Sequence, residues 1–356
     1  MMSAQKDTLL IVDDVAGNLE IMSNILSADY NLKVAKSGSK ALELARMAPF
    51  PSLILLDVIM PEISGFETCR QLKTDPLCKA VPVIFVSTQT DMIDEAMGFA
   101  VGGVDYISKP VSPPIVLARV KTHLDLYNQN RILEKKVYER TLELMQTRDV
   151  AILAITSLAE TRDNETGEHI KRTQHYMKVL AKHMQKNPRF LPHLDDETIE
   201  LLYKSAPLHD VGKIGIRDSI LLKPGALTPD EFTVMKTHTT IGRDTINRSM
   251  EALNLENVSS FLMIGREIAS SHHEKWDGSG YPLGLKGSDI PLSGRLMAIC
   301  DVYDALISKR VYKDPFPHDK AVEIILEGRG QHFDPDLVDA FLLLKSKFDD
   351  IASGKI

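Results

Sequence analysis

Residues 53–67 read LILLDVIMPEISGFE, and this stretch decides the fold of the first third of the chain. It opens with a continuous apolar run, 53–56, that ends at Asp57. Similar runs occupy 9–12 and 83–86, with amphipathic helical patterns such as 17–26 and 39–47 between the runs. Continuous apolar runs are typical of strands that are buried on both faces of a parallel sheet. The alternation therefore predicts an α/β doubly wound parallel sheet, with its site at the carboxyl ends of the strands.

Polar side chains follow each of these strands. They are Asp13, Asp14, Asp57, Ser87, Thr88 and, after a weaker strand around 105–107, Lys109. Any one acid here could simply cap a loop, but carboxylates that occur together with a hydroxyl and a lysine favour a site. The combination predicts bound Mg²⁺ beside an aspartate that can attack a phosphoryl donor.

The motifs of this region are IVDD (11–14), LILLDVIMPEISGFE (53–67), VPVIFVST (81–88) and GGVDYISKP (102–110). Through them, residues 7–122 resemble the receiver domain of bacterial response regulators, and we expect this domain to span 1–122. The resemblance implies phosphorylation at Asp57, a Mg²⁺ site of Asp13, Asp14 and Asp57, and a switch made of Ser87, Tyr106 and Lys109. It also implies a cognate histidine kinase as a partner.

A helical linker is predicted to follow, because residues 113–150 have no internal glycine or proline and carry mixed charge. Apolar residues fall at spacings of seven and four, namely Leu126, Leu133, Val137, Leu144 and Ala151. This spacing is that of a long helix or short coiled coil, although Arg140 and Thr147 interrupt the seam. We expect a linker over 123–148 that is either a solvated helix or a homodimerising coiled coil.

The remainder, residues 149–356, shows helical apolar spacing nearly throughout and predicts an all-α domain. The helical patterns are 151–162, 168–185, 196–207, 229–238, 258–273, 292–308 and 335–347. Two glycine-bearing breaks, 209–213 and 276–284, are the irregular segments that we expect to carry chemistry.

Seven side chains of this half occur in settings typical of metal ligands. They are His169, His209, Asp210, His238, His272, His273 and Asp301. A structural zinc ion needs four ligands, whereas seven suit two hydrolytic metal ions. A lone histidine is more often a surface or core residue, and we give that interpretation to the other six histidines of the chain.

The segments HDVGKIGI (209–216), KTH (236–238), HHEKWDGSGYP (272–282) and DVYDALISKRVYK (301–313) resemble the HD-GYP group of the HD superfamily of phosphohydrolases. The resemblance implies hydrolysis of cyclic di-GMP, to pGpG and/or GMP, at two or three divalent metal ions, Fe or Mn. The implied metal ligands are Glu165, which would accompany a third ion, His169, His209, Asp210, His238, His272, His273 and Asp301. The implied catalytic residues are Lys213, Asp210 and Asp304, and the implied substrate-binding residues are Lys213, Gly280, Tyr281, Arg310 and Lys313. The loop around Gly280 and Tyr281 is also a possible contact for partner proteins. The sequence departs from the common family pattern at Arg217, Gly294 and Ile307, none of which removes a ligand.

The whole sequence thus predicts a response regulator whose phosphodiesterase output is controlled through Asp57. Alternatives are hydrolysis of another cyclic dinucleotide or nucleotide phosphate ester, and a cyclic di-GMP-binding scaffold with weak or no turnover. A net charge of −7 without a basic recognition helix argues against DNA binding. The opening residues resemble neither a signal peptide nor a membrane anchor, and the three cysteines form no CxxC pair. We therefore expect a cytoplasmic protein without a membrane partner.

Overall fold

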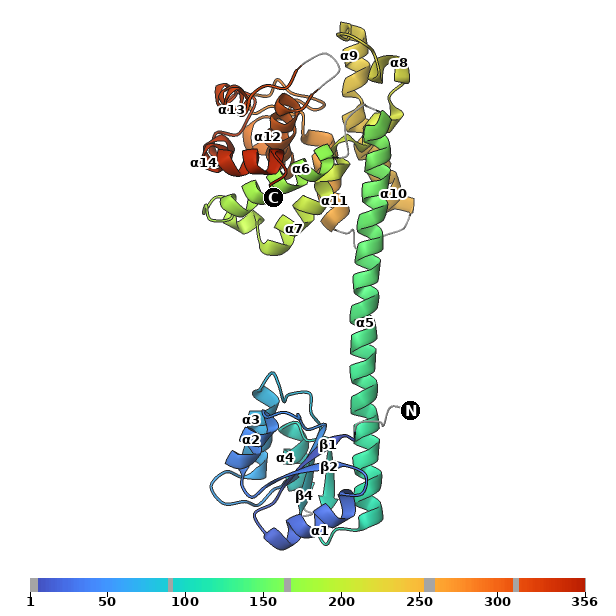
Figure 1. Cartoon of the computed structure of the whole chain (residues 1–356), viewed down its shortest axis with the longest axis vertical. Helices are drawn as coiled ribbons and strands as arrows, with labels where there is room; N and C mark the ends of the chain where they lie inside the picture. The colour runs from blue at the N-terminus through green and yellow to red at the C-terminus, as the bar shows by residue number, and fades with distance from the viewer. Residues whose placement is uncertain (1–5, 89–91, 163–167, 253–259, 310–313, 356) are drawn as a thin grey trace. The chain divides into compact units, whose positions relative to one another are not determined.

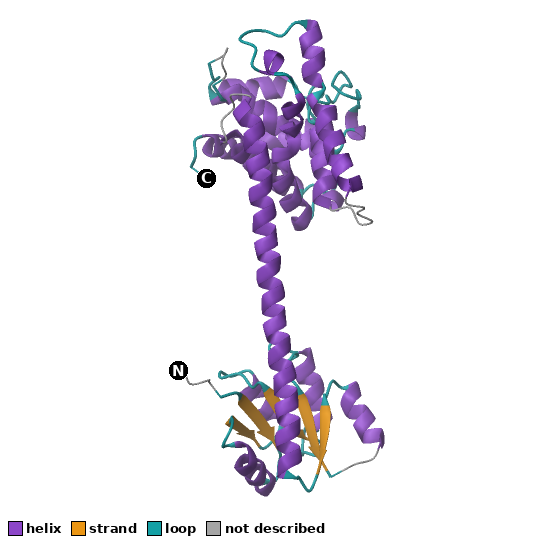
Figure 2. Cartoon of the chain, turned by 90° about the vertical axis from the view of Figure 1, so that its right-hand side faces the viewer, coloured by secondary structure: helices purple, strands orange, loops and turns teal. Residues whose placement is uncertain are grey.

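A five-stranded parallel sheet forms the centre of the first part of the chain (Figure 2). The computed structural model describes residues 6–88, 92–162, 168–252, 260–309 and 314–355. The strands are β1 (Thr8–Val12), β2 (Asn31–Ala35), β3 (Leu53–Asp57), β4 (Val83–Ser87) and β5 (Asp105–Ser108). They run in the order β2-β1-β3-β4-β5, which confirms the predicted fold class. Strand β2 is absent from the sequence prediction because its sequence, NLKVA, is only partly buried at the sheet edge and has no continuous apolar run.

Helices cover both faces of this sheet, because the strand side chains alternate between the faces. Leu9, Ile11 and Leu55 pack in one cluster with residues of helices α1 (Ala16–Leu26) and α5 (Pro113–Arg162). Leu10, Ile54 and Leu56 pack on the other face with residues of α2 (Gly38–Ala45) and α3 (Gly65–Thr74). Helix α4 (Met92–Ala100) lies beside β5.

Helix α5 is 50 residues long and confirms the predicted long helix between the two parts of the chain (Figure 1). Contacts divide the chain into two units, 1–142 and 143–356, and the division falls within α5. The predicted domain boundaries at 122/123 and 148/149 also fall within this continuous helix and remain predictions. Among the described residues, no helix combines the length and apolar character that crossing a bilayer requires.

The second unit is almost entirely helical, as predicted. Its longer helices are α6 (Glu168–Met184), α7 (Asp196–Ser205), α9 (Pro229–Lys236), α10 (His238–Ala252), α11 (Ser260–Ser271), α12 (Leu292–Ile307), α13 (His318–Glu327) and α14 (Pro335–Ala352). Its shorter elements are η1 (Leu191–His193), η2 (Ala206–Gly215), α8 (Asp218–Leu221) and η3 (Gly287–Asp289). The predicted helix over 229–238 is in fact interrupted at Thr237, where α9 ends and α10 begins.

Aromatic packing fixes the helices that carry two of the predicted ligands. Tyr176 on α6 stacks on Phe348 of α14 with ring centroids 4.6 Å apart, and Tyr303 on α12 meets the same ring at 5.3 Å. All three side chains are fully buried. Because α6 also carries His169 and α12 carries Asp301, this core sets the positions of both ligands.

Candidate functional site

The seven predicted metal ligands converge in two clusters. The first holds Asp210, His238, His272 and His273, and the second holds His169, His209 and Asp301. Within each cluster the ligand atoms lie within 4.8 Å of one another. The side chains come from α6, η2, α10, α12 and the turn after α11, so residues far apart in the sequence meet at one place.

Glycines allow the backbone approach that this convergence requires. A Cβ atom on Gly212 of η2 would lie 1.9 Å from the carbonyl oxygen of His238, so a side chain here would separate η2 from α10. A Cβ atom on Gly294 of α12 would lie 2.1 Å from the hydroxyl of Ser271, next to His272. The departure from the common family pattern at Gly294 thus accompanies a close approach of α12 to α11.

The imidazoles are held with one nitrogen facing the site. Nδ1 of His209, His238 and His272 lies 2.9, 2.7 and 2.9 Å from a backbone carbonyl oxygen three or four residues earlier. In the neutral tautomer Nδ1–H donates to that carbonyl, which leaves the Nε2 lone pair for a ligand interaction. Burial lowers the pKa of His238 to about 4, so this ring is neutral at neutral pH, as metal binding requires.

Three buried polar atoms at the centre of the site make no hydrogen bond among the described residues. They are Oδ1 of Asp210 and Nε2 of His238 and of His272. Oδ1 of Asp210 lies 3.3 Å from Nε2 of His238 and 3.7 Å from Nε2 of His272. Buried polar atoms without a partner are costly, and a divalent cation would satisfy all three. Nitrogen and carboxylate donors together therefore suit the metal ions that the sequence predicts.

The carboxylate of Asp210 faces both clusters. Its Oδ1 points to His238 and His272, whereas its Oδ2 lies 3.2 Å from Nε2 of His209 in the second cluster. Oδ2 is also 2.8 Å from the ammonium of Lys213, one turn further along η2. Burial alone would raise the pKa of Asp210, but Lys213 and His209 lower it well below its usual range. Asp210 is thus an ionised carboxylate in the position of a bridge between two cations.

Asp304, which the sequence suggests as a catalytic residue, lies against His169 in the structure. This residue is fully buried, and its Oδ2 lies 2.7 Å from Nδ1 of His169. Arg172 donates to both of its oxygens, from Nε at 2.6 Å and from Nη2 at 2.8 Å. Burial would raise the pKa of Asp304, but the hydrogen bonds from Arg172 and His169 lower it to about 2. With both oxygens engaged, Asp304 is placed to orient His169, and its predicted catalytic role stays a prediction.

The loop after His273 is anchored by a buried glutamate that the sequence analysis did not identify. Glu274 accepts hydrogen bonds from the backbone N–H of Leu283 at 2.7 Å and of Leu285 at 3.0 Å. A Cβ atom on Gly280 would lie 2.2 Å from the backbone nitrogen of Lys275, so Gly280 serves the close folding of the loop. This folding places the Tyr281 ring 4.8 Å from the His273 ring, at the edge of the first cluster.

Three predicted site residues, Glu165, Arg310 and Lys313, lie outside the described residues. Their predicted roles, a third metal ion and contacts to the substrate phosphates, therefore stay predictions. Arg172 and Glu274 are the additional site residues that the structure reveals. The only sequence signal for Arg172 is its position one turn after His169 on the same helix face.

The first unit brings its predicted acidic residues together at the carboxyl ends of β1 and β3. Ligand atoms of Asp13, Asp14 and Asp57 lie within 4.8 Å of one another. The ammonium of Lys109 lies 2.7 Å from Asp13 and 2.8 Å from Asp57. Burial raises the pKa of Asp57 despite the lysine, so a further cation at this acidic pocket would favour its ionised form. Ser87 and Tyr106 lie at the end of β4 and in β5, and both are buried.

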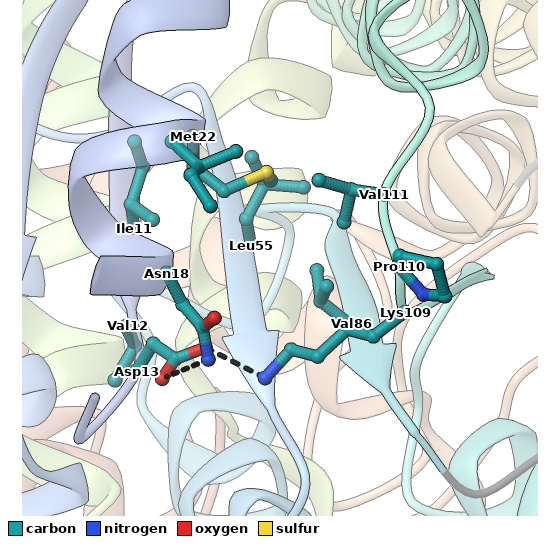
Figure 3. Close-up of a pocket in the computed structure, with 11 residues that line it drawn as sticks. Ile11, Val12, Asp13, Asn18, Met22, Leu55, Val86, Lys109, Pro110 and Val111 are labelled. Carbon is teal, nitrogen blue, oxygen red and sulfur yellow. Dashed lines mark hydrogen bonds and ion pairs between the residues drawn. The ribbon is translucent and has the colours of Figure 1, made fainter. Parts of the chain in front are cut away.

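Behind Lys109 lies a mainly apolar cavity of about 190 Å³. Figure 3 shows its walls, which come from α1, the central strands and the segment Lys109–Val111. Asp13 and Asn18 form its polar end, where Asn18 donates to Asp13 at 3.0 Å. The cavity therefore adjoins the acidic pocket through Asp13 and Lys109.

Comparison with known proteins agrees with this geometry. Residues 9–121 match the response regulator receiver domain, and residues 170–337 match the HD domain. A "Probable cyclic di-GMP phosphodiesterase" of Vibrio cholerae is 50% identical over 352 residues, which cover 97% of this chain and 79% of that protein. A "Cyclic di-GMP phosphodiesterase" of the same organism is 60% identical over 211 residues, or 59% of this chain and 42% of that protein. A "3'3'-cGAMP-specific phosphodiesterase 2", also from Vibrio cholerae, is 39% identical over 219 residues, or 62% of this chain and 39% of that protein.

A receiver fold with an acidic pocket, followed by a helical unit with two His/Asp clusters, defines a response regulator whose output domain carries side-chain clusters that suit metal ions. The similarity to one relative over 97% of this chain, together with the two domain matches, identifies the family within this class. The chain belongs to the family of cyclic di-GMP phosphodiesterases in which a receiver domain precedes an HD domain of the HD-GYP group.

Proposed function

We propose that this response regulator hydrolyses cyclic di-GMP, to pGpG and/or GMP, at the two clusters of its HD unit. The observation that carries the proposal is the buried Asp210 carboxylate, whose two oxygens face different clusters. The names of the relatives at 50% and 60% identity support the choice of substrate.

Each residue of the proposed site has a task that follows from its contacts. Asp210 and the imidazoles would hold two divalent ions, for which the resemblance to the HD-GYP group suggests Fe or Mn and which the mixed nitrogen and carboxylate donors suit. Such ions, when bound, supply activated water at neutral pH and neutralise charge on the phosphate. Lys213 provides a fixed positive charge 2.8 Å from Asp210 for the phosphate oxygens. A third ion with Glu165, and phosphate contacts from Arg310 and Lys313, complete the proposal.

The test is turnover of cyclic di-GMP by anaerobically purified protein, with elemental analysis of the same samples. His209→Ala and Asp210→Ala are expected to abolish turnover and lower metal content while the far-ultraviolet circular dichroism stays unchanged. His193→Ala, at an exposed histidine away from the clusters, is the matched control. Retained turnover in both site variants would refute the proposal, and product analysis of the wild type distinguishes pGpG from GMP.

A second candidate substrate is 3'3'-cGAMP, favoured by the relative that is 39% identical over 219 residues. The two clusters do not discriminate between the candidates, because both molecules carry the same cyclic phosphodiester. Wild-type rates on both dinucleotides, measured side by side, decide between them.

For the receiver unit we propose phosphorylation of Asp57 by a histidine kinase, with Mg²⁺ held by Asp13, Asp14 and Asp57. The contact of Lys109 with Asp57 at 2.8 Å supports this proposal, since the same ammonium can bind a phosphoryl group that is attached to Asp57. Ser87 and Tyr106 are the proposed switch, and α5 is the proposed route from the switch to the HD unit.

A further inference from the structure

Beside the first cluster lies a group of three side chains, of which only Tyr281 has a role so far, as a predicted substrate-binding residue. Phe232 and Lys236 come from α9, and Tyr281 comes from the loop after His273. The rings of Phe232 and Tyr281 are 6.3 Å apart and nearly perpendicular, at 82°. The Lys236 ammonium lies 5.4 Å from the Phe232 ring centroid and 5.9 Å from that of Tyr281. We refer to Phe232, Lys236 and Tyr281 as the aromatic platform.

The platform does not serve the hydrophobic core. Val234 and Met235, also on α9, pack against the small apolar cluster around Ile216 and Ile220, whereas Phe232 is 47% exposed. Within the described part of the chain, Lys236 forms no ion pair. A large exposed aromatic ring beside an ammonium without a carboxylate partner among the described residues suggests a ligand, since their contacts are only with each other and with Tyr281.

The platform is nevertheless held firmly. Thr228 and Glu231 form a reciprocal capping box at the start of α9, and Lys223 pairs with Glu231. Tyr281 is fixed by the Glu274 anchor of its loop and by the His273 ring. A preformed surface of this kind binds a flat ligand without an ordering cost.

The platform lies next to His273, which is one of the proposed metal ligands. The Tyr281 ring lies 4.8 Å from the His273 ring, which in turn lies 5.1 Å from the His238 ring. A nucleotide whose phosphate is held at the first cluster would carry its base outward past Tyr281. The base would therefore arrive at the exposed ring of Phe232, beside the half-buried Lys236.

We propose that the aromatic platform binds one guanine base of the cyclic dinucleotide, with Phe232 as the stacking surface and Lys236 as the group that selects guanine. This inference rests on the proposed function and specifies its substrate recognition. Guanine presents two acceptors, O6 and N7, to an ammonium donor, whereas adenine presents an amino donor beside N7. Stacking on an aromatic ring does not distinguish the two bases.

Substitutions at Lys236 and at Phe232 are therefore expected to weaken the binding of different dinucleotides. In the full-length metal-loaded protein, Lys236→Met is expected to raise the KM for cyclic di-GMP about tenfold. The inhibition constant of a competing cyclic dinucleotide with two adenines is expected to stay within about threefold. Phe232→Ala is expected to weaken both molecules by about tenfold, and Phe232→Trp to restore both, because stacking tolerates either base.

Matched controls are Lys320→Met and Leu343→Ala, at an exposed lysine of α13 and an exposed apolar residue of α14. If Lys236→Met leaves the KM for cyclic di-GMP unchanged, the guanine site is refuted. It is also refuted if this KM and the inhibition constant of the di-adenine competitor rise by the same factor. A wild-type protein that hydrolyses no cyclic di-GMP would instead refute the proposed function itself. The ratio of KM to the inhibition constant distinguishes a change in base recognition from misfolding, because a smaller fraction of active protein changes neither value.

Discussion

At the scale of single residues, Asp304 gives the sharpest prediction. Both of its oxygens are engaged by Arg172, and one of them also by His169. Asp304→Asn keeps one acceptor oxygen and introduces a donor, so it cannot serve both partners. We expect the affinity for the activating metal to fall about 10–100-fold, with turnover recovering when metal is added in excess.

The measurement is a metal titration of turnover in protein that has first been treated with a chelator. Asp319→Asn, at an exposed acid of α13, is the control. Equal half-saturating metal concentrations in the wild type and Asp304→Asn would show that Asp304 does not position His169.

A second residue-scale prediction concerns Glu274. Its buried carboxylate accepts from two backbone N–H groups of the same loop, and glutamine offers only one acceptor oxygen. Glu274→Gln should lower the free energy of unfolding of the loop by about 1–3 kcal/mol, since one buried N–H loses its partner. Amide hydrogen exchange at Leu283 and Leu285 measures this effect, with the exposed Glu327→Gln as control. Unchanged protection at both amides would contradict the anchoring role.

Sequence reasoning identified the seven convergent side chains and Asp304, but not Arg172, which donates to the Asp304 carboxylate. Doublets such as 209–210 and 272–273 carry a local signal, because adjacent ligands are rare outside metal sites. Arg172 and Asp304, in contrast, are 132 positions apart, and the sequence around either residue does not indicate that the two form a pair. Long-range hydrogen bonds of this kind depend on how helices pack, which apolar spacing alone does not specify.

At the scale of elements, the contact between η2 and α10 determines the first cluster. Gly212 lies where a Cβ atom would approach the His238 carbonyl oxygen to 1.9 Å. Gly212→Ala should cost about 1–3 kcal/mol of stability through overpacking and separate Asp210 from His238. We expect reduced metal content and turnover together with a lower unfolding midpoint.

Gly17→Ala is the contrasting substitution, because a Cβ atom at Gly17 of α1 meets nothing within 4 Å. It should be neutral or slightly stabilising, as alanine favours helix over glycine. Thermal unfolding and elemental analysis of both variants measure the difference. Similar stability and metal content in Gly212→Ala and the wild type would refute the close-contact explanation.

The elements themselves were predictable to different degrees. Strands β1, β3 and β4 follow from continuous apolar runs, whereas β2 and α10 lack an equally clear pattern. The sequence predicts only a glycine-bearing break over 209–213, and these residues lie within the 3-10 helix η2. Its irregular geometry is what directs the adjacent side chains of His209 and Asp210 toward the two clusters.

At the scale of the whole molecule, the exposed seam of α5 predicts self-association. Leu126, Leu133, Val137 and Leu144 are between 51% and 70% exposed, although all are large and apolar. We expect a homodimer through this seam, and Val137→Glu with Leu144→Glu should convert it into a monomer in sedimentation velocity. Gln146→Glu adds charge off the seam and should not do so. A monomeric wild type at assay concentrations would contradict the coiled-coil prediction.

Regulation is the property that requires both units. Phosphorylation of Asp57 is expected to alter α5, and the end of this helix is tied to the segment that carries Asp210. Arg162, the last residue of α5, donates to the carbonyl oxygens of Ile214 at 2.6 Å and Ile216 at 3.2 Å. It also pairs with Asp218 at 2.6 Å. We therefore expect a displacement of α5 to reach η2 through this guanidinium.

Cyclic di-GMP turnover with and without a small phosphodonor tests this route in three proteins. The wild type should change its rate, whereas Asp57→Asn should not, because it lacks the phosphoacceptor. Arg162→Met should keep a basal rate but respond less than the wild type, since methionine cannot donate to the two carbonyl oxygens. Arg329→Met, at an exposed arginine paired with Asp339, should respond as the wild type does. Identical rates in all samples would refute control through Asp57, and a full response in Arg162→Met would place the coupling outside this contact.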